Sequence, residues 1–345
     1  MDSILREDIE LFRLPDEIVE RLHGNTIIVT GATGLIGSLF VRCVGAAVRG
    51  IRWILPVRNA EKARRILSQS PVSPGSVEII ETDLVEFFNS TEVRADYIVH
   101  CASPTNGEVI SKHPAETFLL AVESTRAALD YSRRKAVKGM VYVSSLEYYG
   151  QNYNDEPVTE DMIGYVDRHS SRSSYPLGKQ AAEYLCFSYA AEFGTWVATA
   201  RLTQTFGAGV APDDKRVFAQ FARSVIAGND IVLHTDGRSA KPYCYTTDCV
   251  AALVYVLLKG TPGEAYNVAT PGTYVSIREL AETFRDTFNT AINVVVQPRD
   301  CGYAPETRLN LNPAKLLELG WTPRLSLVEM LRRLVDSMLA TGGNN

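Results

Sequence analysis

The stretch TIIVTGATGLIG, residues 26–37, joins a short apolar run to three evenly spaced glycines and then to a helical pattern. Residues 26–30 are rich in β-branched side chains, which favours a buried strand. Gly31 permits a tight turn, Gly34 lets backbone N–H groups approach a pyrophosphate, and Gly37 lets the following helix pack close to the sheet. The start of that helix adds partial positive charge beside a phosphate. We therefore expect a dinucleotide site formed by Gly31, Thr33, Gly34, Leu35, Ile36 and Gly37.

Strand and helix patterns alternate from this stretch as far as residue 202. Apolar strand-like runs recur at 51–57, 77–81, 97–100, 139–144 and 196–202, and helical patterns cover 35–48, 60–67, 114–135 and 175–193. Such alternation is typical of βαβ units and of a parallel sheet that is buried on both faces. The predicted fold class is therefore α/β, with a doubly wound parallel sheet (a Rossmann domain) over residues 25–202.

Two further regions flank this predicted domain. Residues 1–24 are expected to form an N-terminal helical extension whose apolar side carries Leu11, Leu14, Ile18, Val19 and Leu22. Residues 203–345 are richer in Gly, Pro, Asp and Thr, with helical patterns at 217–227, 248–258, 277–287 and 325–339. We expect a smaller substrate-binding lobe there, with some of its strands and helices interleaved with the first domain.

The composition argues against several kinds of partner. With 35 Lys and Arg against 40 Asp and Glu, the 345-residue chain has a net charge of −5, so neither nucleic acid nor an anionic membrane is expected to bind. No apolar run reaches the roughly 18 residues that span a bilayer, and the acidic start is unlike a signal peptide, so a cytoplasmic protein is expected. The six cysteines and five histidines lack metal-ligand spacing. Reduced, structural cysteines and no metal site are therefore predicted.

The end of the second predicted strand bears on the choice between NAD and NADP. NAD sites usually place an acidic residue about 20 residues beyond the glycines, where it binds the ribose hydroxyls. Residues 54–59 contain no acid, and Arg58 lies there instead. Arg58 slightly favours the 2′-phosphate of NADP, with NAD as the alternative. After the third predicted strand, Asp83 and Leu84 are placed to contact the adenine, although Asp83 could equally cap the next helix.

A second set of candidate residues lies on the helix predicted at 175–193. Tyr175 and Lys179 are four residues apart, so their side chains share one helix face. A nearby ammonium favours the phenolate and is expected to lower the pKa of Tyr175, which would suit it as a general acid or base. Ser145 follows the strand predicted at 139–144 and would hydrogen-bond the same substrate oxygen.

With these motifs in place, the chain resembles the extended short-chain dehydrogenases/reductases of the nucleotide-sugar epimerase, dehydratase and decarboxylase group. The matching landmarks are TGATGLIG (30–37), HCASP (100–104), YVSSLEYYG (142–150), YPLGK (175–179), RLTQTFG (201–207), YCYTTD (243–248) and TRLNLNPAKLLELGW (307–321). The resemblance implies an NAD(P)-dependent enzyme acting on a nucleotide sugar, with Ser145, Tyr175 and Lys179 as its catalytic triad.

The same resemblance implies the remaining contacts. Ala102 and Ser103 are expected to lie against the cofactor. Gln204 stands where relatives use Asn to hold the diphosphate, and Lys241 stands where many relatives have an arginine. The expected substrate-binding residues are Pro104, Gln204, Arg238, Lys241 and Arg308.

The resemblance leaves the reaction open among several uses of a 4-keto sugar. Leu146 replaces the acidic half of the Asp-Glu pair that dehydratases carry, which disfavours 4,6-dehydration. C4 epimerisation of a UDP-hexose or UDP-hexuronate needs only the triad and the cofactor, and is the favoured reaction. Glu147, a fourth catalytic candidate, and Arg308 match uronate decarboxylases, which makes UDP-glucuronate decarboxylation the alternative. Selection of NADP by Arg58 would instead suit reduction of a 4-keto sugar.

Two expectations concern the whole molecule. A dinucleotide-binding regulator without activity is disfavoured, because the hydroxyl, tyrosine and lysine of the triad are all present. In similar proteins two long helices often pair across a dimer, and the predicted helices 114–135 and 175–193 are long enough to do so. A homodimer is therefore expected.

Overall fold

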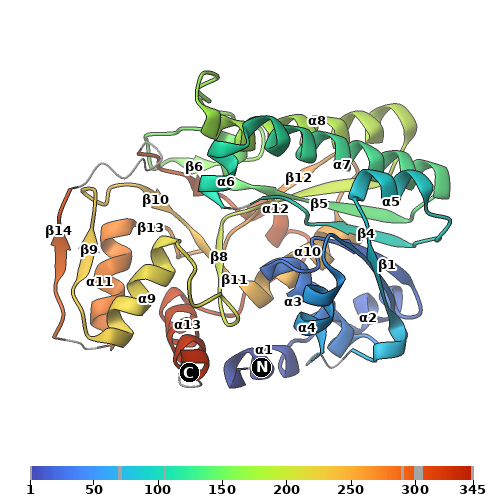
Figure 1. Ribbon diagram of the computed structural model, residues 1–345. Coiled ribbons are helices and arrows are strands. Elements are labelled where there is room, and N and C mark those ends of the chain that lie inside the picture. The colour runs from blue at the N-terminus through green and yellow to red at the C-terminus, as the bar shows by residue number, and fades with distance from the viewer. Residues whose placement is uncertain (1, 69–71, 105, 289–290, 299–305, 343–345) are drawn as a thin grey trace.

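A computed structural model describes residues 2–68, 72–104, 106–288, 291–298 and 306–342 of the chain (Figure 1). Among these residues, the central sheet has seven parallel strands in the order β12-β7-β5-β4-β1-β2-β3. They are β1 (Thr26–Thr30), β2 (Arg52–Val57), β3 (Val77–Glu81), β4 (Tyr97–His100), β5 (Gly139–Ser145), β7 (Val197–Leu202) and β12 (Ala265–Val268). The predicted doubly wound α/β fold is confirmed.

Helices cover both faces of this sheet (Figure 1). Along β1, the fully buried Ile27 and Val29 face one core while Ile28 faces the other, as the alternation of side chains along a strand requires. The first core is closed by α3 (Leu35–Ala47), α4 (Ala60–Leu67) and α10 (Thr246–Lys259). The second is closed by α5 (Leu84–Ser90), α7 (Pro114–Lys135) and α8 (Ser174–Phe193).

The C-terminal part of the chain builds a smaller lobe with its own core. Its helices are α9 (Val217–Ala227), α11 (Ile277–Phe288) and α13 (Leu327–Gly342), and Phe218, Phe221 and Phe284 are buried between them. Short strand pairs complete the lobe and join it to the first domain. These pairs are β9 (Ile231–Leu233) with β14 (Val294–Val296), β10 (Ala240–Lys241) with β13 (Val275–Ser276), β8 (Gln204–Phe206) with β11 (Tyr243–Tyr245), and β6 (Pro157–Val158) with β15 (Asn310–Leu311). Of the short helices, α6 (Gly107–Lys112) packs against α7 and α8, and α12 (Ala314–Leu317) packs against β12 and α10, where Leu316 joins the first core.

The division expected at residue 203 does not separate the two parts cleanly. Both β12 and α10 follow that residue in the chain, yet β12 pairs with β7 and α10 contributes to the core beneath the sheet. The first domain therefore takes back a strand and a helix from the C-terminal region.

The N-terminal extension forms two helices, α1 (Ser3–Glu10) and α2 (Asp16–Leu22), with Pro15 between them. Leu14, Ile18 and Leu22 are buried as expected, but Leu11 is 56% exposed. The prediction of Leu11 on the apolar side is wrong, because α1 ends there and Leu11 caps its C-terminus.

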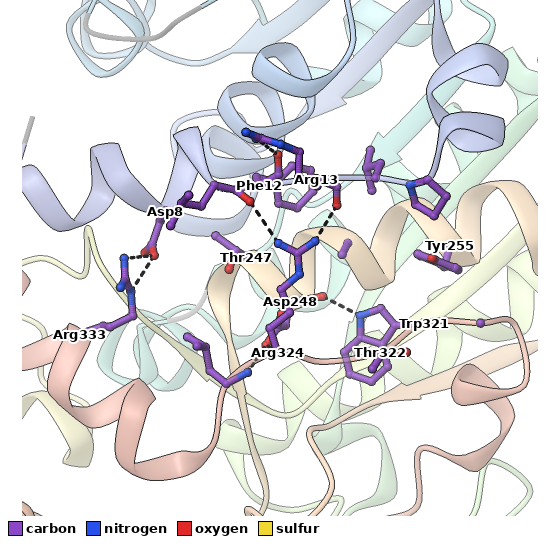
Figure 2. Close-up of a pocket in the computed structure, with 16 residues that line it drawn as sticks. Asp8, Phe12, Arg13, Thr247, Asp248, Tyr255, Trp321, Thr322, Arg324 and Arg333 are labelled. Carbon is purple, nitrogen blue, oxygen red and sulfur yellow. Dashed lines mark hydrogen bonds and ion pairs between the residues drawn. The ribbon is translucent and has the colours of Figure 1, made fainter.

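The extension bridges the two parts of the molecule (Figure 2). Helix α1 packs against α3 of the first domain and α13 of the lobe. Asp8 accepts a hydrogen bond from Arg333 Nε at 2.8 Å. Arg324 donates to the carbonyl oxygens of Leu11 and Arg13 at 3.1 and 3.2 Å. These contacts border a cavity of about 540 Å³.

Two sequence expectations can be compared with smaller features. Cys43, Cys101, Cys186, Cys244 and Cys249 are free thiols, whereas Cys301 lies outside the described residues. In the described parts of the chain, no helix combines the length and apolar character needed to cross a membrane.

Candidate active site

A cavity of about 660 Å³ opens at the carboxyl ends of β1, β2, β4 and β5. The order in which strands are added to the sheet reverses here, because β1 pairs with β2 on one side and with β4 on the other. Ligands of open α/β sheets bind at such a point. The predicted site residues that line the cavity are Gly31, Thr33, Gly34, Leu35, Ile36, Gly37, Arg58, Asp83, Leu84, Ala102, Ser103, Pro104, Ser145, Glu147, Tyr175, Lys179 and Gln204. Their convergence makes this cavity the candidate active site.

The glycine turn has little room for side chains. Gly31 has φ +67°, and a Cβ there would lie 2.9 Å from the backbone nitrogen of Ala102. A Cβ on Gly37 would lie 2.4 Å from the carbonyl oxygen of Gly31. Gly34 begins α3 without a side-chain cap, so the first N–H groups of the helix can face an anion. These residues fit the pyrophosphate of a dinucleotide, which would carry hydride chemistry to this cavity.

Two cations and one acid line the cavity near the carboxyl ends of β2 and β3. Arg58 and Lys62 both line it, and Lys62 lies on α4 directly after the end of β2. Sequence reasoning missed Lys62, although its position four residues after Arg58 was a usable signal. Asp83 caps α5 by accepting hydrogen bonds from the N–H groups of Val85 and Glu86 at 2.8 and 3.3 Å. Asp83 also lines the cavity, so capping leaves its contact with a ligand possible.

Tyr175 and Lys179 both face the cavity from the first turns of α8. Lys179 Nζ donates to the carbonyl oxygen of Val143 at 2.8 Å and lies 5.7 Å from the centre of the Tyr175 ring. Burial lowers the pKa of Lys179 to about 8. Burial, and then the charge of Glu147, raise the pKa of Tyr175 to about 12. The predicted lowering of the Tyr175 pKa is therefore wrong, because the cost of ionising a buried phenol outweighs the nearby positive charge.

A buried ion pair supports this helix from behind. Glu183, one turn after Lys179, pairs with Arg201 at 2.9 Å, and both side chains are less than a tenth exposed. Ser144 donates its hydroxyl hydrogen to the same carboxylate, and Arg201 donates to the hydroxyl of Tyr149 at 2.9 Å. The carboxylate of Glu183 raises the pKa of Lys179 against the effect of burial. The pair, together with Ser144, thus ties α8 to β5 and β7 beside Tyr175 and Lys179.

The cavity lining near Tyr175 also contains a partly buried ion pair. Arg172 Nη2 lies 2.8 Å from Glu147 Oε1, and each side chain is about a third exposed. The guanidinium carbon of Arg172 lies 5.6 Å from the centre of the Tyr175 ring. Sequence reasoning missed Arg172. It precedes Tyr175 by only three residues, a spacing that lets the two side chains lie close together.

Three predicted substrate residues do not line this cavity. Arg238 is 66% exposed and pairs with Asp236 at 2.9 Å. Arg308 pairs with Asp155 and lies 3.7 Å from Glu306. Lys241 lies on β10 of the lobe, where Glu147 raises its pKa and burial, the larger effect, lowers it. The structure therefore brings Pro104 and Gln204 into the lining, but neither Arg238, Lys241 nor Arg308.

Solved structures with this architecture include nucleotide-sugar enzymes. The UDP-glucose 4-epimerase of Thermus thermophilus, solved with NAD, is 25% identical with a TM-score of 0.75, covering 91% of this chain and 99% of that one. The UDP-glucuronic acid 4-epimerase of Bacillus cereus, solved with UDP-glucuronic acid and NAD, has a TM-score of 0.75 over 92% of this chain and 99% of that one. At 18% identity, the second match shows the fold alone.

Curated proteins with similar sequences also carry the names of nucleotide-sugar enzymes. UDP-glucuronic acid decarboxylase 1 of Arabidopsis thaliana is 28% identical over 90% of this chain and 69% of its own length. The Danio rerio protein named UDP-glucuronic acid decarboxylase 1 is 26% identical over 93% of this chain and 74% of its own length. The sequence model of the NAD dependent epimerase/dehydratase family matches residues 27–269. The chain therefore belongs to this family of enzymes.

Proposed function

We propose that this protein decarboxylates a UDP-hexuronate through a 4-keto intermediate, with NAD(P) as cofactor. The observation that carries the proposal is Glu147, which lines the cavity beside Tyr175 and is held by Arg172 at 2.8 Å. The decarboxylase names of the curated relatives support this reaction. It therefore takes precedence over the C4 epimerisation that the motifs alone favoured.

Oxidation at C4 is what makes the sugar carboxylate leave, because the C6 carboxylate is then β to a ketone. Tyr175 accepts the proton of the C4 hydroxyl as general base, and Ser145 hydrogen-bonds the same oxygen. A dinucleotide held by the turn at Gly31, Gly34 and Gly37 would supply the hydride chemistry for oxidising C4 and for reducing it again. The oxidation is thus reversed within one turnover, and no outside oxidant is consumed.

The decarboxylation step needs one further proton. As CO₂ leaves, the electron pair of the C5–C6 bond moves onto the C4 carbonyl and forms an enolate. We assign to Glu147 the relay of this proton from water to C5: its carboxylate takes a proton from solvent and passes it on, since the group lines the cavity with Tyr175. Tyr175 then returns its proton to the C4 oxygen when the ketone is reduced.

For the cofactor we propose NADP, with NAD as the alternative. Arg58 and Lys62 line the cavity after β2. Two cations suit the 2′-phosphate of NADP better than they suit the free ribose hydroxyls of NAD. Because the hydride returns to the sugar, the reaction balances with either dinucleotide.

C4 epimerisation is the second candidate. It is favoured by the 25% identity to the Thermus thermophilus UDP-glucose 4-epimerase and uses the same triad. In that reaction the 4-keto sugar turns within the site before the hydride returns to its other face, and Glu147 takes no proton.

The experiment that separates these functions is proton NMR of the purified protein with UDP-glucuronate, with NAD and NADP in separate tubes. A UDP-pentose or UDP-4-ketopentose supports decarboxylation, whereas UDP-galacturonate supports epimerisation and contradicts it. An unchanged UDP-glucuronate in both tubes contradicts both uronate reactions. A Tyr175→Phe sample serves as the control, and no product is expected from it.

A further inference from the structure

Arg172 has one half of its guanidinium engaged and the other half without an acceptor. Nη2 holds Glu147, but Nη1 is buried and has no hydrogen-bond partner among the described residues. Burying an unpaired charged donor is costly, so a group of this kind usually serves a ligand or a network. Arg172 lines the active-site cavity and lies against the Tyr175 ring, so its open donor belongs to the place where the sugar reacts.

The ion pair with Glu147 engages Nη2 alone, so the guanidinium of Arg172 keeps donor capacity toward a second anion. A charged donor of this kind, close to the general base Tyr175, suits an anionic group on the reacting end of the sugar.

The position of Arg172 beside Tyr175 decides which anion its open donor would meet. In a nucleotide sugar the diphosphate is attached at C1, across the ring from C4, whereas a uronate carboxylate hangs on C5 next to C4. A cation beside the base that acts on C4 therefore faces the carboxylate rather than the diphosphate. Arg308, which the family resemblance assigned to substrate binding, pairs with Asp155 and does not line the cavity.

We propose that Arg172 is the specificity residue for a uronate: its free Nη1 edge binds the sugar carboxylate while Nη2 keeps Glu147 in place. The inference rests on the proposed function and names the feature of the substrate that the site reads. One guanidinium then joins the departing carboxylate and the proton donor, a bridging geometry that a single ammonium does not reproduce.

The test compares two nucleotides that differ only at C6, UDP-glucuronate and UDP-glucose. Their dissociation constants are measured by calorimetry on the wild-type protein loaded with the reduced dinucleotide, which cannot oxidise C4 and so prevents turnover, and on the variants Arg172→Gln and Arg172→Lys loaded in the same way. Arg168→Gln is the matched control, because Arg168 lies in the same segment, is exposed and does not line the cavity. Melting temperatures establish that each variant is folded.

The wild type is expected to prefer UDP-glucuronate, and Arg172→Gln to weaken that ligand by about 10- to 100-fold, the effect of one charge-assisted hydrogen bond. UDP-glucose binding should change by no more than about twofold, and Arg172→Lys should retain part of the preference. If Arg172→Gln does not fold, a loss of about tenfold in the uronate preference of Arg172→Lys carries the test.

Three results would overturn the inference: a wild type without preference, equal weakening of both nucleotides, or an Arg172→Lys variant that keeps the full preference. Equal weakening would mean that Arg172 holds the shared diphosphate. A carboxylate preference that depends on Arg172 could be found together with no release of CO₂. That result supports the inference and contradicts only the proposed decarboxylation.

Discussion

Tyr175 and Lys179 occupy neighbouring positions on α8, yet burial moves their pKa values in opposite directions. It raises the pKa of the phenol to about 12 and lowers the pKa of the ammonium to about 8. In both cases the neutral form is favoured, because a buried charge loses its hydration. At neutral pH, Tyr175 therefore holds its proton strongly and depends on its neighbours, above all the Ser145 hydroxyl and Arg172, to release it.

Removing the Tyr175 hydroxyl should abolish the chemistry and spare the cofactor. We expect Tyr175→Phe to lower kcat on UDP-glucuronate by about 100-fold or more, the usual contribution of a general base. Affinity for the dinucleotide, measured by fluorescence titration, should stay within about twofold. Tyr165→Phe is the control, since Tyr165 is 62% exposed and does not line the cavity. Equal turnover by wild type and Tyr175→Phe would remove Tyr175 from the reaction.

For Arg58 the proposal concerns a different property, the choice between NAD and NADP. We expect Arg58→Ser to weaken NADP by about tenfold or more, because a charge-assisted hydrogen bond to the 2′-phosphate is lost, and to leave NAD binding nearly unchanged. Arg52→Ser is the matched control, because Arg52 is exposed at the opposite end of β2. An equal loss for both dinucleotides would mean that Arg58 contacts the adenine or the pyrophosphate instead.

At the scale of elements, the attachment of α8 to the sheet rests on the buried Glu183–Arg201 pair. Removing one partner of a buried pair leaves the other charge unpaired, so Glu183→Gln should cost about 3 kcal/mol of unfolding free energy. The exposed pair of Arg52 and Glu78, also close at 2.7 Å, provides the comparison, and Glu78→Gln should cost less than about 1 kcal/mol. Denaturant unfolding measures both variants. Similar losses in the two variants would show that burial does not control the strength of this pair.

The elements themselves were largely predictable from local pattern. The predicted spans 26–30, 60–67, 77–81, 97–100 and 114–135 coincide with β1, α4, β3, β4 and α7, because each has a clear apolar period and a sharp boundary. The short helices α5 and α6 and the strand β12 were not predicted. A helix of seven or fewer residues makes too few turns to show a helical period, and β12 is defined by its pairing with the distant β7.

The site divides in the same way. Residues on the glycine turn and on α8 could be placed from sequence because local spacing fixes their positions. The partners of these residues could not, because Arg172 meets Glu147 and Arg201 meets Glu183 only after the chain has folded. Arg238 and Arg308 were misplaced for the same reason, since their nearby acids Asp236 and Asp155 compete for them.

At the scale of the whole molecule, Asp8 makes the link between the N-terminal extension and the lobe sensitive to pH. Burial raises the pKa of Asp8 from 3.8 to about 6, so the folded protein binds this proton more tightly than the unfolded chain does. The resulting stability is fully present below about pH 4 and is lost as the pH rises through about 6.

The pH dependence of the unfolding free energy tests this role of Asp8. Relative to Asp8→Asn, the wild type should lose about 2 kcal/mol of unfolding free energy between about pH 4 and about pH 8. Glu7→Gln is the control, because Glu7 lies beside Asp8 but is half exposed. Denaturant unfolding across this range gives the result, and a constant difference between wild type and Asp8→Asn would contradict it.

The long helices α7 and α8 leave an apolar surface that suits a second copy of the chain. Tyr184 and Phe187 of α8 are 69% and 53% exposed with ring centres 6.2 Å apart, and Leu119 of α7 is 47% exposed. Large apolar groups gathered on two packed helices favour a self-complementary, two-fold contact. We therefore expect a homodimer by light scattering, and a monomer after Tyr184→Lys with Phe187→Glu. Tyr153→Lys, at a 64% exposed residue away from these helices, should remain dimeric. A monomeric wild type, or a dimer that survives the double substitution, would place the association elsewhere or exclude it.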